Sequence, residues 1–166
     1  KVDWLLSAYR TRNRNDIQYI ASAIRGRAYF QNIGATRRQG IEASVKASRG
    51  GLTGAISYAF TDATYRAPLT LASPANPQAD DDGRIAVARG DRLPGIPRHN
   101  ATLSLDYATA RWSVGGDVLA RSGQYLVGDE GNDTRQVPGY AIVNLRGSVT
   151  IVPGVSLFGE VRNAFN

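Results

Sequence analysis

The stretch FQNIGATRRQGIEASVKAS, Phe30 to Ser48, is the part of the sequence that decides the fold. Its second half alternates strictly between apolar and polar residues. The apolar residues are Ile41, Ala43, Val45 and Ala47, and the polar residues are Glu42, Ser44, Lys46 and Ser48. Successive side chains of a β-strand point to opposite faces of a sheet. The pattern therefore predicts a strand with one apolar face and one charged face.

The composition excludes several classes of protein. The chain has 166 residues, the length of one domain. It has no Cys, which excludes disulfides and thiolate metal sites. It also has no Met, so we expect it to be a piece of a longer protein. No apolar run of about 18 residues is present, which excludes a membrane-spanning helix. Transmembrane strands stay possible, because they alternate and leave the mean hydropathy ordinary.

The charge balance is basic, but the basic residues are scattered. The net charge is +6, and all but two of the 20 basic side chains are Arg. Such an excess suits a polyanionic partner, either nucleic acid or the phosphates of a lipid surface. The arginines are spread from Arg10 to Arg162, with no dense basic block, zinc-finger spacing or RNA-recognition signature. We therefore expect no nucleic-acid partner.

Period-two alternation between clusters of Gly, Pro, Asn and Asp predicts about seven strands, and no sustained helical stripe is present. The expected strands are Val2–Asn13, Ala28–Ser48, Leu52–Arg66, His99–Tyr107, Arg111–Val127, Gly139–Ile151 and Val155–Asn163. The fold class is therefore all-β.

The connections between these strands alternate in length. The tight turns are Arg49–Gly51, Ala108–Ala110 and Val152–Gly154, and the long loops are Arg14–Arg27, Ala67–Arg98 and Gly128–Pro138. An antiparallel up-and-down meander produces this order, with every tight turn at one end and every long loop at the other. Bacterial outer-membrane barrels have this asymmetry, with short periplasmic turns and long extracellular loops.

A soluble β-sandwich would show the same alternation, with apolar residues inside and polar residues outside. Three features favour a transmembrane barrel instead. The loops alternate strictly in length, several strands reach about 15 residues against a usual 5–6, and aromatic residues gather near strand ends, as in the girdles of membrane barrels. Trp112 and Tyr107 flank one tight turn, and Tyr125 and Tyr140 flank a long loop.

In a barrel, the polar face of each strand lines the lumen, because a basic side chain facing lipid costs about 2–4 kcal/mol near the midplane. The predicted lumen-lining residues are Glu42, Lys46, Asp106, Asp117, Arg121, Arg146, Glu160 and Arg162. We interpret most of them as structural charge in a wet interior rather than as ligand contacts. Single-chain bacterial barrels have even strand numbers, so we expect further strands before residue 1 and after residue 166.

Three segments carry motifs that can be compared with known proteins. FQNIGATRRQGIEASVKAS contains Asn32-x-Gly34-Ala35, the basic pair, and Gly40-Ile41-Glu42. RLPGIPRHNATLSLDY, residues 92–107, contains a Pro-x-x-Pro-x-His/Asn approach to a strand, and VPGYAIVNLRGSVTIVPGVSLFGEVRNAFN, residues 137–166, is a hairpin that ends in Asn-x-Phe-Asn. Together these segments resemble the TonB-dependent outer-membrane receptors, in which the last of them corresponds to the penultimate hairpin.

The resemblance implies that residues 1–166 are a C-terminal fragment of a 22-stranded barrel whose plug domain is absent from this chain. It implies a cell outer membrane location in a Gram-negative bacterium, with outer-membrane lipid and lipopolysaccharide around the barrel. It also implies active, TonB-energised import of a scarce small molecule, most often a ferric siderophore, with the plug domain and TonB as partners in the full-length protein. A passive porin-type barrel and a soluble β-sandwich binding module are the alternatives.

No catalytic constellation is visible, so we expect no enzyme activity, no cofactor and no metal site. The single His, His99, lacks partners for catalysis or metal binding nearby in the sequence. The acidic run in the longest loop lacks the spaced ligands of a calcium loop. Ligand specificity is expected in the long loops, around Asp80, Asp81, Asp82, Arg84, Asp129 and Glu130, without one residue standing out.

Overall fold

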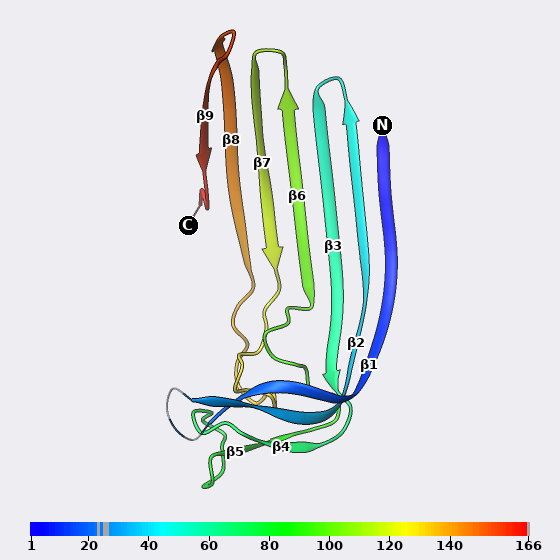
Figure 1. The fold of residues 1–166 in the computed structure, drawn as a ribbon, viewed down its shortest axis with the longest axis vertical. Coiled ribbons are helices and arrows are strands. Elements are labelled where there is room, and N and C mark those ends of the chain that lie inside the picture. Colours follow the sequence, from blue (N-terminus) through cyan, green and yellow to red (C-terminus); the bar gives the residue numbers. More distant parts are fainter. Residues whose placement is uncertain (23, 25–26, 166) are drawn as a thin grey trace.

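The computed structural model describes residues 1–22, 24 and 27–165. Its regular elements are β-strands (Figure 1). They are β1 (Val2–Ala21), β2 (Ala28–Arg49), β3 (Leu52–Tyr65), β4 (Leu69–Ala72), β5 (Arg84–Val87), β6 (His99–Ala108), β7 (Trp112–Arg121), β8 (Tyr140–Val152) and β9 (Val155–Val161). Within the described residues, no helix is long and apolar enough to cross a membrane.

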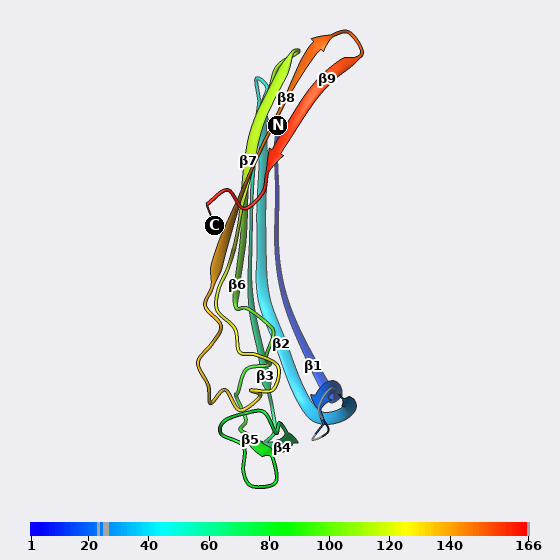
Figure 2. The ribbon, with the colours of Figure 1, turned by 90° about the vertical axis from the view of Figure 1, so that its left-hand side faces the viewer.

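Seven strands form one antiparallel sheet in the order β1-β2-β3-β6-β7-β8-β9. Each strand pairs with the next along the chain, apart from the small β4–β5 hairpin, which forms a second sheet of its own. The predicted all-β, up-and-down meander is therefore confirmed. Seen from the side, the main sheet is a single curved layer (Figure 2).

The tight turns lie at one end of the sheet and the long connections at the other (Figure 1). Gly50 and Gly51 join β2 to β3 with φ of 58° and 85°. Positive φ at both central residues is the requirement of a type I′ hairpin turn, which matches the twist of its strands and which Gly meets without strain. In the β8–β9 turn, Gly154 has φ 85° and follows a Pro, the arrangement of a type II turn.

The first strand is longer than predicted. The alternation predicts that it ends at Asn13, whereas β1 continues to Ala21 and stays paired with β2. The pairing shifts register between Asn13 and Ile17, opposite Gly34, whose φ is 74°. The Asn32 side chain accepts a hydrogen bond from the Gly34 amide at 2.8 Å. This bulge accompanies a sharp bend, so the ends of β1 and β2 cross the loop end of the sheet (Figure 1).

Two further boundaries differ from the prediction. The strand expected over Arg111–Val127 ends at Arg121 in β7, because beyond it the chain meets its partner only through an isolated bridge between Gln124 and Val137. The connection Ala67–Arg98, expected to be a loop, contains the β4–β5 hairpin. The remaining strand ends lie within about two residues of the predicted ones, a usual uncertainty at element ends.

The buried apolar core lies at the loop end rather than within the sheet. It consists of Ile20, Ile33, Ala63, Tyr65, Leu71, Ile85, Val87 and Leu93. These residues come from the bent ends of β1 and β2, the end of β3, the β4–β5 hairpin and the segment after it. We call this unit the loop cap: residues 16–21, 28–34, 62–98 and 122–139. In contrast, both faces of the sheet body are largely exposed.

Candidate functional site

The pairing register places seven of the eight predicted lumen-lining residues on one face of the sheet, and Arg162 follows just beyond the end of β9. Directly paired residues of neighbouring strands share a face. Lys46 pairs with Ala55, Ala55 with Ser104, and Ser104 with Asp117. Glu42 connects in the same way through Ala59 and Asn100 to Arg121, and Asp106 connects through Gly115 and Arg146 to Glu160. We refer to this face of the sheet as the polar face.

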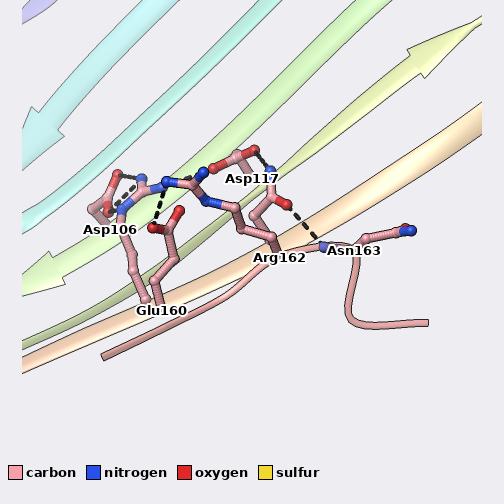
Figure 3. Close-up of polar contacts among 7 residues, drawn as sticks. Asp106, Asp117, Glu160, Arg162 and Asn163 are labelled. Carbon is pink, nitrogen blue, oxygen red and sulfur yellow. Dashed lines mark hydrogen bonds and ion pairs between the residues drawn. The ribbon is translucent and has the colours of Figure 1, made fainter. Parts of the chain in front are cut away.

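Arg146 is the centre of a charge cluster on the polar face, together with Asp106 and Asp117, which are labelled in Figure 3. Its Nε and Nη2 donate to the two carboxylate oxygens of Asp106 at 2.9 and 2.7 Å. Its Nη1 donates to Asp117 at 2.8 Å. The cluster joins β6, β7 and β8 across the sheet, and one cation faces two carboxylates. A bidentate pair of this kind orders the side chains more than a single contact does.

Two asparagines extend this cluster toward the end of the chain. Asn144 donates its side-chain amide to Asp117 at 2.8 Å and accepts the backbone amide of Asn163 at 3.1 Å. Beside it, Arg162 donates to Glu160 at 3.0 Å. Figure 3 shows Glu160, Arg162 and Asn163 near Asp106 and Asp117. The charged groups of this cluster are thus paired with one another and link neighbouring strands.

The opposite face is apolar and exposed, and we call it the apolar face. Its members include Trp4, Val45, Ile56, Leu103, Val118 and Val143, which form one row across six strands. Trp4 is 74% exposed and Leu103 is 50% exposed. A contiguous exposed apolar surface of this extent marks contact with a partner or a membrane.

At the loop end, three connections bind to one another by hydrogen bonds. Asn76 donates to the Gly128 carbonyl at 2.8 Å. Asn132 accepts the Arg92 amide at 2.6 Å and donates to the Arg92 carbonyl at 3.0 Å. The Arg92 guanidinium also lies 5.5 Å from the centre of the Tyr125 ring, within the range of a cation–π contact. The long loops are therefore folded against each other, which sequence alternation alone does not indicate.

Two of the residues expected near ligand lie inside the loop cap. Asp129 accepts the amides of Asp133 and Thr134 and the Thr134 hydroxyl. Glu130 is 2% exposed and accepts the Gly128 amide at 3.1 Å. Burial raises the pKa of Glu130 above its ordinary value, since a buried carboxylate loses its hydration. Ligand could reach these two residues directly only if the loop cap opened.

The other four expected positions are exposed. Asp80, Asp81 and Asp82 lie in the connection between β4 and β5, and Arg84 is the first residue of β5. The Asp80 carboxylate accepts the amides of Asp82 and Arg84 at 3.1 and 2.8 Å, so it stabilises the turn itself. Across the part of the chain that the structure describes, no group of three or more His, Cys, Asp or Glu could hold a metal ion.

A hollow of about 250 Å³ opens where the bent strands meet the loops. Its polar lining includes Asp16, Gln18 and Arg38, and its apolar lining includes Ile33 and Leu93. Arg38 donates to Asp16 at 2.9 Å. Such a mixed lining can hold a small molecule that has both apolar and hydrogen-bonding groups. Asp16 and Gln18 are not among the residues predicted from the sequence, because the predicted first strand ends at Asn13 and no motif marks them.

An antiparallel wall with one apolar face, one charged face, tight turns at one end and a loop cap at the other defines an outer-membrane type of barrel wall. The family described as "TonB dependent receptor-like, beta-barrel" matches residues 1–164. The chain therefore belongs to the TonB-dependent receptor β-barrel family, whose members are receptors of the Gram-negative outer membrane and not enzymes.

Among solved structures, the chain is similar to the "Copper transporter OprC", with a TM-score of 0.65 and 20% sequence identity. The match covers 99% of this chain and 23% of that protein. The chain thus spans about a quarter of the length of this neighbour, and at this identity the likeness concerns the fold.

Proposed function

We propose that this chain is a C-terminal part of the barrel wall of an outer-membrane active transporter, which imports a scarce small molecule with energy supplied through TonB. The observation that carries the proposal is the two-faced sheet of a receptor-family chain: the apolar face suits lipid, and the polar face suits a water-filled interior. In this arrangement the Arg146 cluster faces the lumen. The plug domain and TonB are the partners of the full-length protein.

The proposed ligand is a ferric siderophore or a similar iron complex. The family resemblance supports it, together with the mixed lining of the hollow beside Asp16 and Arg38. A bare copper ion is a poorer candidate for the loops of this chain. Copper prefers thiolate, thioether or imidazole donors, and the chain has no Cys, no Met and a single His. A chelated metal instead offers oxygen and nitrogen groups that Arg, Gln and Asp can bind.

Growth of a deletion strain tests the proposal. The strain is supplied in turn with ferric siderophores, haem, vitamin sources and copper under limitation, with the full-length gene restored as the control. We expect growth on at least one ferric siderophore to be lost on deletion and recovered on complementation. Growth that fails only under copper limitation would contradict the iron-complex proposal.

Two further comparisons separate the alternatives. A TonB deletion abolishes uptake through an energised receptor but leaves a passive porin working. A full-length protein that is monomeric and soluble without detergent would favour a β-sandwich binding module and contradict the membrane barrel.

We also expect loop variants such as Arg84→Ala to change ligand affinity without changing the amount of folded barrel.

A further inference from the structure

The apolar face changes character abruptly near the loop end. Along this face, Ala8, Ile41, Phe60 and His99 form one row across four strands. Beside that row, the Tyr58 hydroxyl lies 2.7 Å from His99 Nδ1, and the Phe60 and His99 rings are 5.4 Å apart. Aromatic side chains of this kind gather at the boundary between hydrocarbon and water in membrane barrels.

The next two rows on the same face are polar and contain three arginines and one aspartate. They consist of Arg10 with Gln39 and Asp62, and then Arg12 with Arg37 and Thr64. Alternate residues on one face are spaced about 7 Å apart along a strand, so the change from apolar to basic takes place within one or two side-chain lengths. An aromatic belt followed at once by arginines is the order expected at a membrane surface that carries negative charge.

Five arginines gather in this region: Arg10, Arg12, Arg37, Arg66 and Arg89, which we call the arginine patch. The pKa of Arg66 is lowered, first by desolvation and then by the positive charges of the other four. Each of the four therefore lies close enough to Arg66 to act on its charge, and the pairing register places Arg12 directly beside Arg37. Bound anions would relieve the repulsion between these charges.

The chain supplies little compensation of its own. Asp62 forms the one ion pair to the patch among the described residues, with Arg37 at 2.9 Å, and it also pairs with Arg98 at 3.2 Å. Nε of Arg37 and Nε of Arg98 are buried, with no hydrogen-bond partner in the described part of the chain. Arg10, Arg12 and Arg89 are exposed. One carboxylate thus serves several guanidinium groups.

We propose that the arginine patch binds the phosphate groups of lipopolysaccharide in the outer leaflet, on the lipid-facing side of the barrel. Continuity with the apolar face and charge complementarity select this occupant: the acyl chains lie against the apolar rows, and the phosphates lie at the height of Arg10 and Arg12. Guanidinium groups bind phosphate in a bidentate manner, which suits Arg rather than Lys here. The inference rests on the proposed outer-membrane barrel.

The test uses the full-length protein in detergent and diphosphoryl lipid A as the probe, with binding measured by equilibrium titration. The R10Q/R12Q variant is compared with R49Q/R111Q, which removes two exposed arginines at the tight-turn end. A cation near an anionic membrane surface changes affinity about fivefold. We expect R10Q/R12Q to bind about 25-fold more weakly and R49Q/R111Q to bind as the native protein does. Heat-dependent gel mobility verifies that both variants fold.

Three results would overturn the proposal: native affinity in R10Q/R12Q, an equal loss in R49Q/R111Q, or displacement of lipid A by an equal concentration of inorganic phosphate. Dephosphorylated lipid A should bind the native protein and R10Q/R12Q equally weakly. If the native protein is soluble without detergent, the proposed outer-membrane function is contradicted. If the native protein is a membrane barrel but R10Q/R12Q binds lipid A normally, only the proposed role of the arginine patch is contradicted.

Discussion

Gly40, in the segment that decides the fold, is a position where a single methyl group should be costly. Gly40 is buried in β2, and the Tyr9 ring of β1 passes over it to reach β3, where the Tyr9 hydroxyl lies 3.1 Å from the Thr61 hydroxyl. A methyl group at this position would collide with the Phe60 carbonyl oxygen and would lie 2.8 Å from the Tyr9 hydroxyl oxygen. Gly40→Ala must therefore displace either the Tyr9 ring or the β2–β3 pairing.

The size of the effect follows from these contacts. A carbon atom and an oxygen atom without a covalent bond between them approach to about 3.3 Å, so Tyr9 must move by roughly half an ångström and the β3 backbone by more. Inserting a methylene into a packed site costs about 1–3 kcal/mol. Losing the bond to Thr61 adds about 0.5–1.5 kcal/mol. We expect Gly40→Ala to lower the free energy of unfolding by about 1.5–4.5 kcal/mol.

The assay is denaturant unfolding of the full-length protein in detergent, with Gly159→Ala as the matched control. A methyl group at Gly159 would have no atom within 4 Å, and its backbone is not left-handed. Alanine there should leave stability unchanged or raise it by up to about 1 kcal/mol. If Gly40→Ala unfolds within experimental error of Gly159→Ala, the packing of Tyr9 across β2 is refuted.

Three other predictions concern the charge cluster and the loop cap. Arg146→Gln should cost about 1 kcal/mol, as expected for partly exposed ion pairs, and a double-mutant cycle with Asp106→Asn should give a coupling energy above zero; strict additivity would count against the cluster. The raised pKa of Glu130 means that its stabilising contribution is present below the ordinary pKa of 4.5 and is lost as pH rises through the raised value. The free energy of opening of the loop cap can be measured by hydrogen exchange corrected for intrinsic rates. We expect it to fall with rising pH more steeply in the native protein than in Glu130→Gln. Equal pH slopes in the two proteins would contradict the burial of Glu130. Ile85→Ala should destabilise the loop cap by about 2–5 kcal/mol and speed exchange there while β6 and β7 stay protected; uniform acceleration would show that the loop cap is not a separate unit.

The meander and its two faces could be predicted because their signals are local. Gly50-Gly51 and Pro153-Gly154 mark turns by residue type alone, and alternation assigns each side chain to a face once the strand is recognised. Register follows from the turn within each tight hairpin, and the shared face of Glu42 and Arg121 is predicted by the alternation within each strand. Asn32 and Gly34 belong to one of the motifs that resemble the receptor family. In the structure they lie at the bulge where β2 bends.

The loop cap could not be predicted, because its structure depends on contacts between distant segments. Strands of four residues, such as β4 and β5, carry too few residues for alternation to stand out. An acidic pair such as Asp129-Glu130 predicts exposed side chains, since carboxylates are rarely buried without partners. Some of its partners are close in sequence, such as Thr134 and Gly128, but Gln18, at 3.4 Å from Glu130, is more than a hundred residues away. The expected ligand contacts at Asp80 to Asp82 stay a prediction.

The central claim is that the apolar face meets lipid and the polar face meets water, and spin labels at two adjacent residues of β6 test it most directly. Leu103→Cys and Ser104→Cys are made separately in the full-length protein and labelled in lipid bilayers, and the collision rates of each label with oxygen and with a water-soluble nickel complex are measured. We predict that the label at Leu103 collides mainly with oxygen in lipid and that the label at Ser104 collides mainly with the nickel complex. Equal access of both labels to the nickel complex, or the reverse pattern, would contradict the account.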